Sequence, residues 1–140
     1  METIKEIQTE IIEEFEMFDD WMQKYEYLID LGKELAPIEE QYKTEDNLIK
    51  GCQSRVWLHA QQQDGKINYT ADSDAIMTKG IIAILIRVLS GQKAEEIVSA
   101  DLSFIDTIGL KEQLSASRAN GLVSMIKKIK LYALALENRC

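Results

Sequence analysis

The feature of this sequence that most limits its fold is the dipeptide Asp64-Gly65, which joins two segments of alternating polarity. In residues 56–61 and 66–71 an apolar side chain recurs at every second position, which is the pattern of a half-buried β-strand. Asp-Gly favours a two-residue hairpin turn, because both positions of a type I′ turn require positive φ angles. The sequence therefore predicts two antiparallel strands joined by a tight turn, and we expect Trp57 to lie in the core.

A central helix is predicted directly after this hairpin. From residue 74 the apolar period changes from two to about 3.6, and a wide apolar stripe from Ile76 to Leu89 is typical of a buried helix. We expect Ser73 or Asp74 to cap its N-terminus and the glycine at position 91 to follow its C-terminus. Gly80 costs stability relative to alanine within such a helix, which indicates close packing at that point.

The remaining segments are predicted to be helices and loops. A first amphipathic helix covers residues 3–18, and a second opens at Asp19 or Asp20 and reaches Gly32, which either ends it or weakens it. Pro37 starts a polar, acidic loop over residues 38–50, with a short strand near residues 47–49. Short helical pieces are expected at 94–98, 102–108 and 110–114, and Ser115 or Ser117 caps a last helix that carries apolar residues as far as Leu136.

These elements predict a fold of class α+β, in which several helices pack against a small antiparallel β-sheet. The chain has 140 residues, which is the length of one domain and enough to bury a core without cross-links. Its 46% hydrophobic and 29% charged residues are typical of a globular protein. We therefore expect a single domain over residues 1–140.

Charge and cysteine content exclude several classes of function. The formal net charge of −8 argues against nucleic acid as a partner, because phosphate binding relies on clustered Lys and Arg, and a protein partner is expected instead. The cysteines Cys52 and Cys140 and the single histidine, His59, form neither a disulfide framework nor a metal site. The N-terminus has no signal-peptide pattern and no apolar run is long enough to span a bilayer. We expect a cytoplasmic protein with free thiols and no membrane contact.

Cys52 is the candidate reactive residue. It lies between a loop and a strand, and a rigid strand below a loop is a common support for a reactive group. The alternative is that Cys52 is only a small buried hydrophobic residue. Lys50 and Arg55 are nearby cations of the kind that favour a thiolate. His59 is seven residues further along an extended segment, which is too far for it to act as the base.

The sequence resembles the SufE family of sulfur acceptor proteins at three separate motifs. These are Gly51-Cys52-Gln53-Ser54-Arg55-Val56-Trp57-Leu58, then Asp72-Ser73-Asp74 with Lys79-Gly80-Ile81-Ile82-Ala83 in the following helix, and finally Ser117-Arg118-Ala119-Asn120-Gly121-Leu122. The motifs stand in the family's order and at its spacing across nearly the whole chain. The family fold, similar to that of scaffold proteins of the IscU and NifU type, is a small antiparallel sheet packed with helices, in agreement with the prediction above.

The resemblance implies a role in iron-sulfur cluster assembly. Family members accept persulfide sulfur from a pyridoxal-phosphate-dependent cysteine desulfurase (SufS-type), stimulate that enzyme, and pass the sulfur to a scaffold complex (SufBCD-type). By motif position the acceptor is Cys52, and the supporting residues are Gly51, Gln53, Ser54, Asp74, Arg118, Asn120 and Gly121. The chain itself is then expected to need no metal and no cofactor, because pyridoxal phosphate belongs to the partner and sulfur is held only transiently on Cys52.

The resemblance also implies roles for the residues around the cysteine. Gly51 is expected to be the hinge of a loop that rests Cys52 against an apolar pocket and swings out on docking. Arg118 either stabilises the sulfur anion or pairs with the partner, or it holds the loop against the last helix together with Asn120. Cys140 is expected to be a dispensable tail thiol.

Three classes of function remain open at this point. The favoured one is a persulfide transfer partner that resembles a sulfurtransferase and activates its desulfurase, rather than a stand-alone enzyme. The second is a regulatory adaptor that docks on a desulfurase without carrying sulfur, and the third is a thiol enzyme in its own right. In each case we expect a monomer or a weak homodimer.

Overall fold

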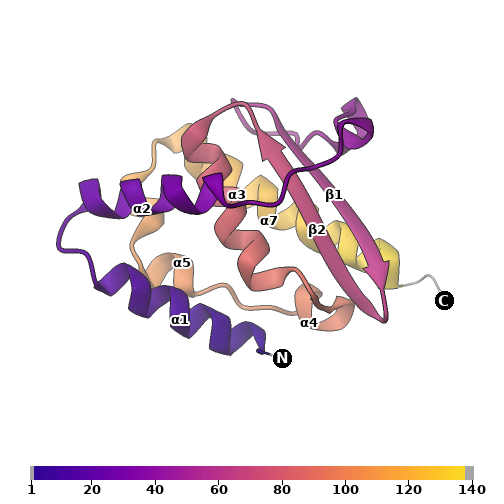
Figure 1. The fold of residues 1–140 in the computed structure, drawn as a ribbon, viewed down its shortest axis with the longest axis horizontal. Helices are drawn as coiled ribbons and strands as arrows, with labels where there is room; N and C mark the ends of the chain where they lie inside the picture. Colours follow the sequence, from indigo (N-terminus) through magenta and orange to yellow (C-terminus); the bar gives the residue numbers. More distant parts are fainter. Residues whose placement is uncertain (1, 138–140) are drawn as a thin grey trace.

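The computed structural model describes residues 2–137 and shows the predicted α+β fold (Figure 1). A β-hairpin lies on one side of the molecule, helix α3 passes through the centre, and other helices pack around α3. The helices are α1 (Ile4–Glu16), α2 (Trp21–Lys33), α3 (Ile76–Leu89), α4 (Ala94–Val98), α5 (Phe104–Thr107), α6 (Leu110–Gln113) and α7 (Ala116–Glu137). Two short 3-10 helices, η1 (Glu40–Tyr42) and η2 (Glu45–Asn47), interrupt the segment between α2 and the sheet, which the sequence predicted as a loop.

The sheet is antiparallel, with the strand order β1-β2-β3. Strands β1 (Val56–Gln63) and β2 (Lys66–Ser73) pair along their full lengths around Asp64 and Gly65, whose φ angles are +54° and +78°. The predicted hairpin and its turn are therefore confirmed. The third strand, β3 (Gln92–Lys93), pairs only with the start of β2, and its two residues are too few to produce an alternating pattern in the sequence.

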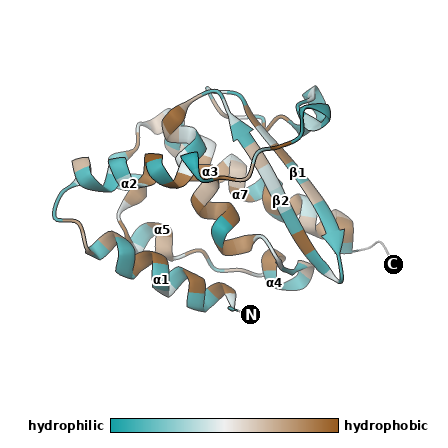
Figure 2. Cartoon of the chain, in the orientation of Figure 1, coloured by the Kyte–Doolittle hydropathy of each residue, from teal (hydrophilic) through white to brown (hydrophobic). Residues whose placement is uncertain are grey.

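Helix α3 forms the centre of the hydrophobic core. Ten of its 14 residues are buried, and Figure 2 shows it as a largely apolar helix between the hairpin and the outer helices. The prediction was wrong for Ile76, which is 67% exposed because it is the first residue of the helix and projects beyond the packed region. The apolar stripe therefore becomes buried only from the second half of the first turn.

Helices α2 and α3 cross at two glycines. A Cβ atom on Gly80 would lie 2.5 Å from the backbone oxygen of Leu28, and a Cβ atom on Gly32 would lie 2.9 Å from the backbone nitrogen of Gly80. Both distances are shorter than van der Waals contact, so any larger residue would push the helices apart. The close packing predicted at Gly80 is confirmed, and Gly32 is a contact residue within α2 rather than its end.

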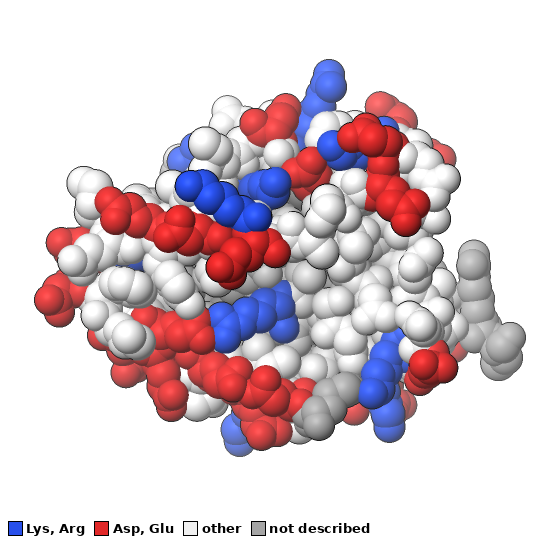
Figure 3. Space-filling view, in the orientation of Figure 1, with Lys and Arg blue, Asp and Glu red and all other residues white. Residues whose placement is uncertain are grey.

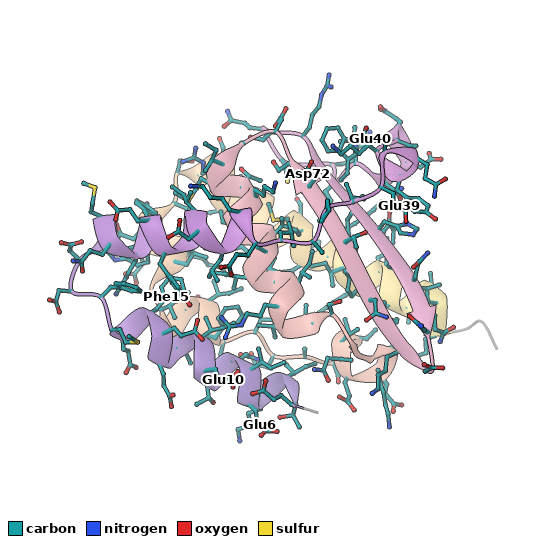
Figure 4. The ribbon with its side chains drawn as sticks, in the orientation of Figure 1. Glu6, Glu10, Phe15, Glu39, Glu40 and Asp72 are labelled. Atoms are coloured by element: carbon teal, nitrogen blue, oxygen red, sulfur yellow. The ribbon has the colours of Figure 1, made fainter. Side chains whose placement is uncertain are left out.

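The segment that follows α2 covers the outer face of the hairpin. Trp57, which was predicted to lie in the core, is only partly buried on this face, with Nζ of Lys43 at 5.6 Å from the centroid of its ring. Lys43 also pairs with Asp72 of β2 at 3.0 Å. Lys43 pairs with Glu40 at 3.2 Å as well, and Figure 4 shows Glu39, Glu40 and Asp72 near the same end of the hairpin. Because successive side chains of a strand alternate between faces, the buried neighbours of Trp57 direct it outward.

Acidic side chains gather over α1 and α2 on the face shown in Figure 3. Between these helices, Arg87 of α3 donates two hydrogen bonds to the carboxylate of Glu14 in α1, at 2.7 and 2.6 Å. The Arg87 guanidinium keeps the pKa of Glu14 below its usual value. Within residues 2–137, none of the helices combines the length and the apolar content needed to cross a lipid bilayer.

Candidate functional site

Cys52 lies in a short loop, residues 50–55, whose two ends are joined by the backbone. The amide of Ile49 donates to the carbonyl oxygen of Val56 at 2.8 Å, and Leu48 forms an antiparallel bridge with Trp57. The short strand predicted near residues 47–49 is reduced to this single bridge, because Asn47 belongs to the 3-10 helix η2. We call residues 50–55 the Cys52 loop, and its closed base limits any movement to the residues between these anchors.

Asp74 holds the C-terminal end of the Cys52 loop, at Arg55. Its backbone amide donates to the carbonyl oxygen of Arg55 at 3.2 Å, and its Oδ1 accepts a hydrogen bond from the backbone amide of Arg55 at 3.0 Å. The prediction that Ser73 or Asp74 caps α3 was wrong: the N-cap residue is Ala75, and no side chain caps the helix. The Ser73 hydroxyl accepts instead from the amide of Ala75, at 3.2 Å. Asp74 therefore positions the Cys52 loop rather than the helix.

Gly51 occupies a position that only glycine fits. Its φ angle is +93°, in the left-handed region that other residues rarely adopt. A Cβ atom here would also lie 2.4 Å from Oγ of Ser124 in α7. The Cys52 loop therefore lies directly on α7, with its glycine backbone against a serine side chain.

The thiol of Cys52 is half-buried and points toward α7. Its Sγ donates a long hydrogen bond to the carbonyl oxygen of Gly121, at 3.7 Å, and a Cβ atom on Gly121 would lie 3.3 Å from Sγ. Gly121 thus leaves just enough room for the sulfur. Burial raises the pKa of the Cys52 thiol, which favours the neutral form in this conformation.

A small pocket opens beside the thiol. Its volume is about 50 Å³, and it is lined by Cys52, Gln53 and Ser54 of the loop, Thr78 and Ile81 of α3, and Ser117, Arg118, Gly121 and Met125 of α7. This volume exceeds the ~10–15 Å³ that a cavity needs to hold one water molecule. The pocket can therefore receive one additional heavy atom on Cys52, at the point where the loop and two helices meet.

The structure brings together most of the residues predicted to support Cys52. Gln53, Ser54, Arg118 and Gly121 line the pocket of the thiol, whereas Gly51 lies against Ser124 of α7, Asp74 acts on the base of the loop and Asn120 is exposed on α7. In the part of the chain that the structure describes, neither the Arg118 nor the Asn120 side chain forms a hydrogen bond or an ion pair. The hydrogen bonds by which Arg118 and Asn120 were predicted to hold the loop against α7 are therefore not present in this conformation, and the hydrogen bond between the loop and α7 is the one from Cys52 to Gly121. Cys140 lies outside the described residues.

The cations near Cys52 in the sequence are directed elsewhere. Lys50 is exposed and pairs with Glu45 at 3.3 Å, and Arg55 is exposed at the base of the loop. His59 stacks on Tyr42 on the outer face of the hairpin, with ring centroids 3.5 Å apart, and serves no function at the thiol. The resting conformation therefore holds a protected thiol, and the cation that lines its pocket is Arg118 rather than Lys50 or Arg55.

Four residues of the pocket were not predicted as site residues, namely Thr78, Ile81, Ser117 and Met125. Ser117 had been considered only as a helix cap and as part of a motif. Ile81 and Met125 lie in predicted apolar stripes, which gave no reason to separate them from other core residues. Thr78 had no signal, because a single threonine in an apolar helix carries no pattern. Among residues 2–137, no cluster of three or more His, Cys, Asp or Glu side chains is arranged to hold a metal ion.

The sequence matches the SufE family, an Fe-S metabolism associated domain, over residues 9–133. The chain belongs to the SufE family. The match includes the Cys52 loop, the hairpin, α3 and most of α7. Membership of this family associates the protein with Fe-S metabolism.

Known members of the family are similar along most of this chain. An uncharacterized SufE-like protein of Rhizobium meliloti (strain 1021) is 42% identical over 126 residues, which cover 86% of this chain and 90% of the relative. An uncharacterized SufE-like protein of Synechocystis sp. is 39% identical, over 91% of this chain and 80% of the relative. The SufE-like protein 1, chloroplastic/mitochondrial, of Arabidopsis thaliana is 40% identical over 91% of this chain, which spans 35% of that longer protein.

The fold is also similar to a solved structure. The solution structure of a hypothetical protein from Thermus thermophilus superimposes with a TM-score of 0.77, covering 92% of this chain and 94% of the other. The two sequences are 18% identical, so this similarity concerns the fold alone. It supports the arrangement of a small sheet packed with helices that carries the Cys52 loop.

Proposed function

We propose that this protein is a sulfur acceptor and carrier in iron-sulfur cluster assembly, and that Cys52 holds the sulfur as a persulfide. The observation that carries the proposal is the position of the thiol, half-buried within an anchored loop beside a pocket with room for one more heavy atom. The membership of the SufE family supports it. The sulfur donor is a pyridoxal-phosphate-dependent cysteine desulfurase, and the receiver is a scaffold complex.

The transfer step is a thiol-persulfide exchange. The Cys52 thiolate attacks the outer sulfur of the desulfurase persulfide, a new S–S bond forms on Cys52, and the S–S bond of the desulfurase breaks. The electron pair of the broken bond leaves with the desulfurase thiolate, so no external oxidant or reductant is needed. Nucleophile and leaving group are both thiolates, so the step requires alignment more than acid-base assistance.

The resting conformation suits a carrier that must avoid side reactions. Burial raises the pKa of Cys52, so the thiol reacts slowly with other electrophiles while the loop is closed. Docking of the desulfurase opens the loop, and Gly51 provides the backbone freedom because it already adopts a positive φ angle. Removal of the product sulfur would also accelerate the desulfurase.

Sulfur loading is tested by intact mass spectrometry after incubation with a cysteine desulfurase, pyridoxal phosphate and free cysteine. We expect the Cys140→Ser variant to gain one sulfur that a reductant removes, and the Cys52→Ser variant to gain none. Both variants should retain binding to the desulfurase. A sulfur found only on Cys140 would refute the proposal.

The same pair of variants separates a carrier from a regulatory adaptor. An adaptor that only docks on the desulfurase would stimulate it without using the thiol, so Cys52→Ser would keep the effect. A carrier loses the stimulation with the thiol. Measured desulfurase turnover with each variant therefore decides between the two classes.

A further inference from the structure

Thr78 is a buried residue at the Cys52 pocket. It is 5% exposed and lines the same pocket as the thiol. Among residues 2–137, its hydroxyl has no hydrogen-bond partner in the protein.

The position of Thr78 in α3 explains why its hydroxyl is unpaired. Threonines in helices often donate to the carbonyl four residues earlier, as Thr9 does to Lys5 at 3.1 Å and Thr107 to Ser103 at 3.2 Å. Thr78 is the third residue of α3, so the carbonyl four residues earlier is that of Asp74, which lies one residue before the N-cap residue Ala75, whereas Ser103 is itself the N-cap residue of α5. The usual partner is therefore out of position, and the donor remains available.

The free hydroxyl is in contact with open space. Among the described residues, the unpaired side-chain nitrogen or oxygen that is sealed from solvent is His59 Nε2, on the other face of the hairpin. The unpaired hydroxyl oxygen of Thr78 is therefore not sealed. The open space next to Thr78 is the pocket of about 50 Å³ that it shares with Cys52. An S–S bond is about 2.05 Å long, so an outer sulfur on Cys52 that turned into this pocket would share it with Thr78.

We propose that Thr78 is a binding residue for the persulfide: its hydroxyl donates a hydrogen bond to the outer sulfur of Cys52 when that sulfur occupies the pocket. This inference rests on the proposed function, because it assigns a retention site for the sulfur carried there. Ile81 and Met125 supply apolar walls, and Gly121 leaves the space on the α7 side. Thr78 supplies a neutral donor from inside the pocket, whereas Arg118 is exposed at its edge.

The hydrogen bond stabilises the closed, loaded conformation. A persulfide is an anion at neutral pH, and burying an anion without a donor is unfavourable. A single hydrogen bond contributes about 0.5–1.5 kcal/mol, so its loss should make the outer sulfur about threefold to tenfold more accessible to attack. The inner sulfur and the transfer chemistry are unchanged.

The test compares Thr78→Val with Thr78→Ser in a Cys140→Ser background. Cys52 is loaded chemically with sodium polysulfide: the Cys52 thiolate takes one sulfur, and a polysulfide dianion one sulfur shorter is released. After removal of the excess, cyanide is added, which takes the outer sulfur as thiocyanate and returns the Cys52 thiolate. The rate of thiocyanate formation measures how well the outer sulfur is retained.

We expect thiocyanate to form about threefold to tenfold faster in Thr78→Val than in the Cys140→Ser parent. Thr78→Ser keeps a hydroxyl, so its rate should lie close to that of the parent. A merely structural role would instead rank the variants by side-chain volume, with serine worse than valine. Equal rates in all three proteins, or a fast rate in Thr78→Ser, would overturn the inference.

Chemical loading keeps this result separate from the proposed function. If polysulfide loads Cys52 but no desulfurase does, the proposed function fails and the retention site is still measured. If the desulfurase loads Cys52 normally while Thr78→Val and the parent react with cyanide at the same rate, the retention site fails alone. If polysulfide forms no persulfide on Cys52, both are overturned.

Discussion

Replacing Gly121 with alanine should release the Cys52 thiol without unfolding the protein. The added Cβ atom would lie 3.3 Å from Sγ of Cys52 and 3.8 Å from its Cα and Cβ atoms. Only the sulfur contact is shorter than the 3.5–4.0 Å of ordinary contact, so the thiol has to move by a few tenths of an ångström. Overpacking of this kind costs about 1 kcal/mol at its lower limit.

The same substitution also has a stabilising effect, which offsets this cost. Gly121 lies within α7, and alanine favours a helix over glycine by about 1 kcal/mol. The two terms nearly cancel, so we expect the free energy of unfolding in urea to stay within about 1 kcal/mol of wild type. The overpacking cost of about 1 kcal/mol destabilises the closed position of the thiol and not the rest of the fold. The thiol is then exposed about five times more often, so alkylation should be about fivefold faster.

The assay is the rate of Cys52 alkylation by iodoacetamide in a Cys140→Ser background, followed by mass spectrometry. Lys127→Ala is the matched control, because it also adds alanine to α7 but lies at an exposed position away from the thiol. The control should alkylate at the parental rate. An unchanged or slower rate in Gly121→Ala, with stability preserved, would refute the account of how the thiol is seated.

Three further outcomes follow from the geometry of the site. Asp74→Ala removes the acceptor for the Arg55 amide, so urea unfolding should show a loss of about 1 kcal/mol and Cys52 should alkylate faster, whereas Asp74→Asn should retain most of both. Gly80→Ala places a Cβ atom 2.5 Å from the backbone oxygen of Leu28, so the clash should outweigh the ~1 kcal/mol that alanine contributes to helix stability. The free energy of unfolding in urea should therefore fall. Burial raises the pKa of Cys52, so alkylation of the folded protein should reach its midpoint at higher pH than in urea. The thiol then contributes stability below its unfolded pKa, and this contribution is lost as the pH rises through the folded pKa; a lower midpoint for the folded protein would contradict this.

The hairpin and the central helix were predictable because local rules decide them. Asp64 and Gly65 can adopt the positive φ angles of a tight turn, and the register of β1 and β2 follows directly from that turn. The apolar period of α3 likewise needs no tertiary information. Cys52 could be singled out as well, since its place between loop and strand is visible in the sequence.

The contacts around the site could not be predicted in the same way. Aspartate is a residue type common at helix N-caps, yet Asp74 accepts a hydrogen bond from the backbone amide of Arg55. Arg55 lies 19 positions earlier in the sequence, and the hairpin brings it alongside Asp74. The contacts of Gly51 with Ser124 and of Cys52 with Gly121 depend on how α7 packs on the loop. Such long-range packing has no local pattern, and Thr78 gains its significance only from it.

The crossing of α2 and α3 limits how far the α3 side of the Cys52 pocket can move. Gly80 is two residues from Thr78 and adjacent to Ile81, and its backbone is already in contact with α2. The α3 residues that line the pocket, Thr78 and Ile81, therefore cannot shift toward α2. Under the proposed function, a desulfurase therefore reaches Cys52 by displacing the Cys52 loop, while the α3 side of the pocket keeps its shape.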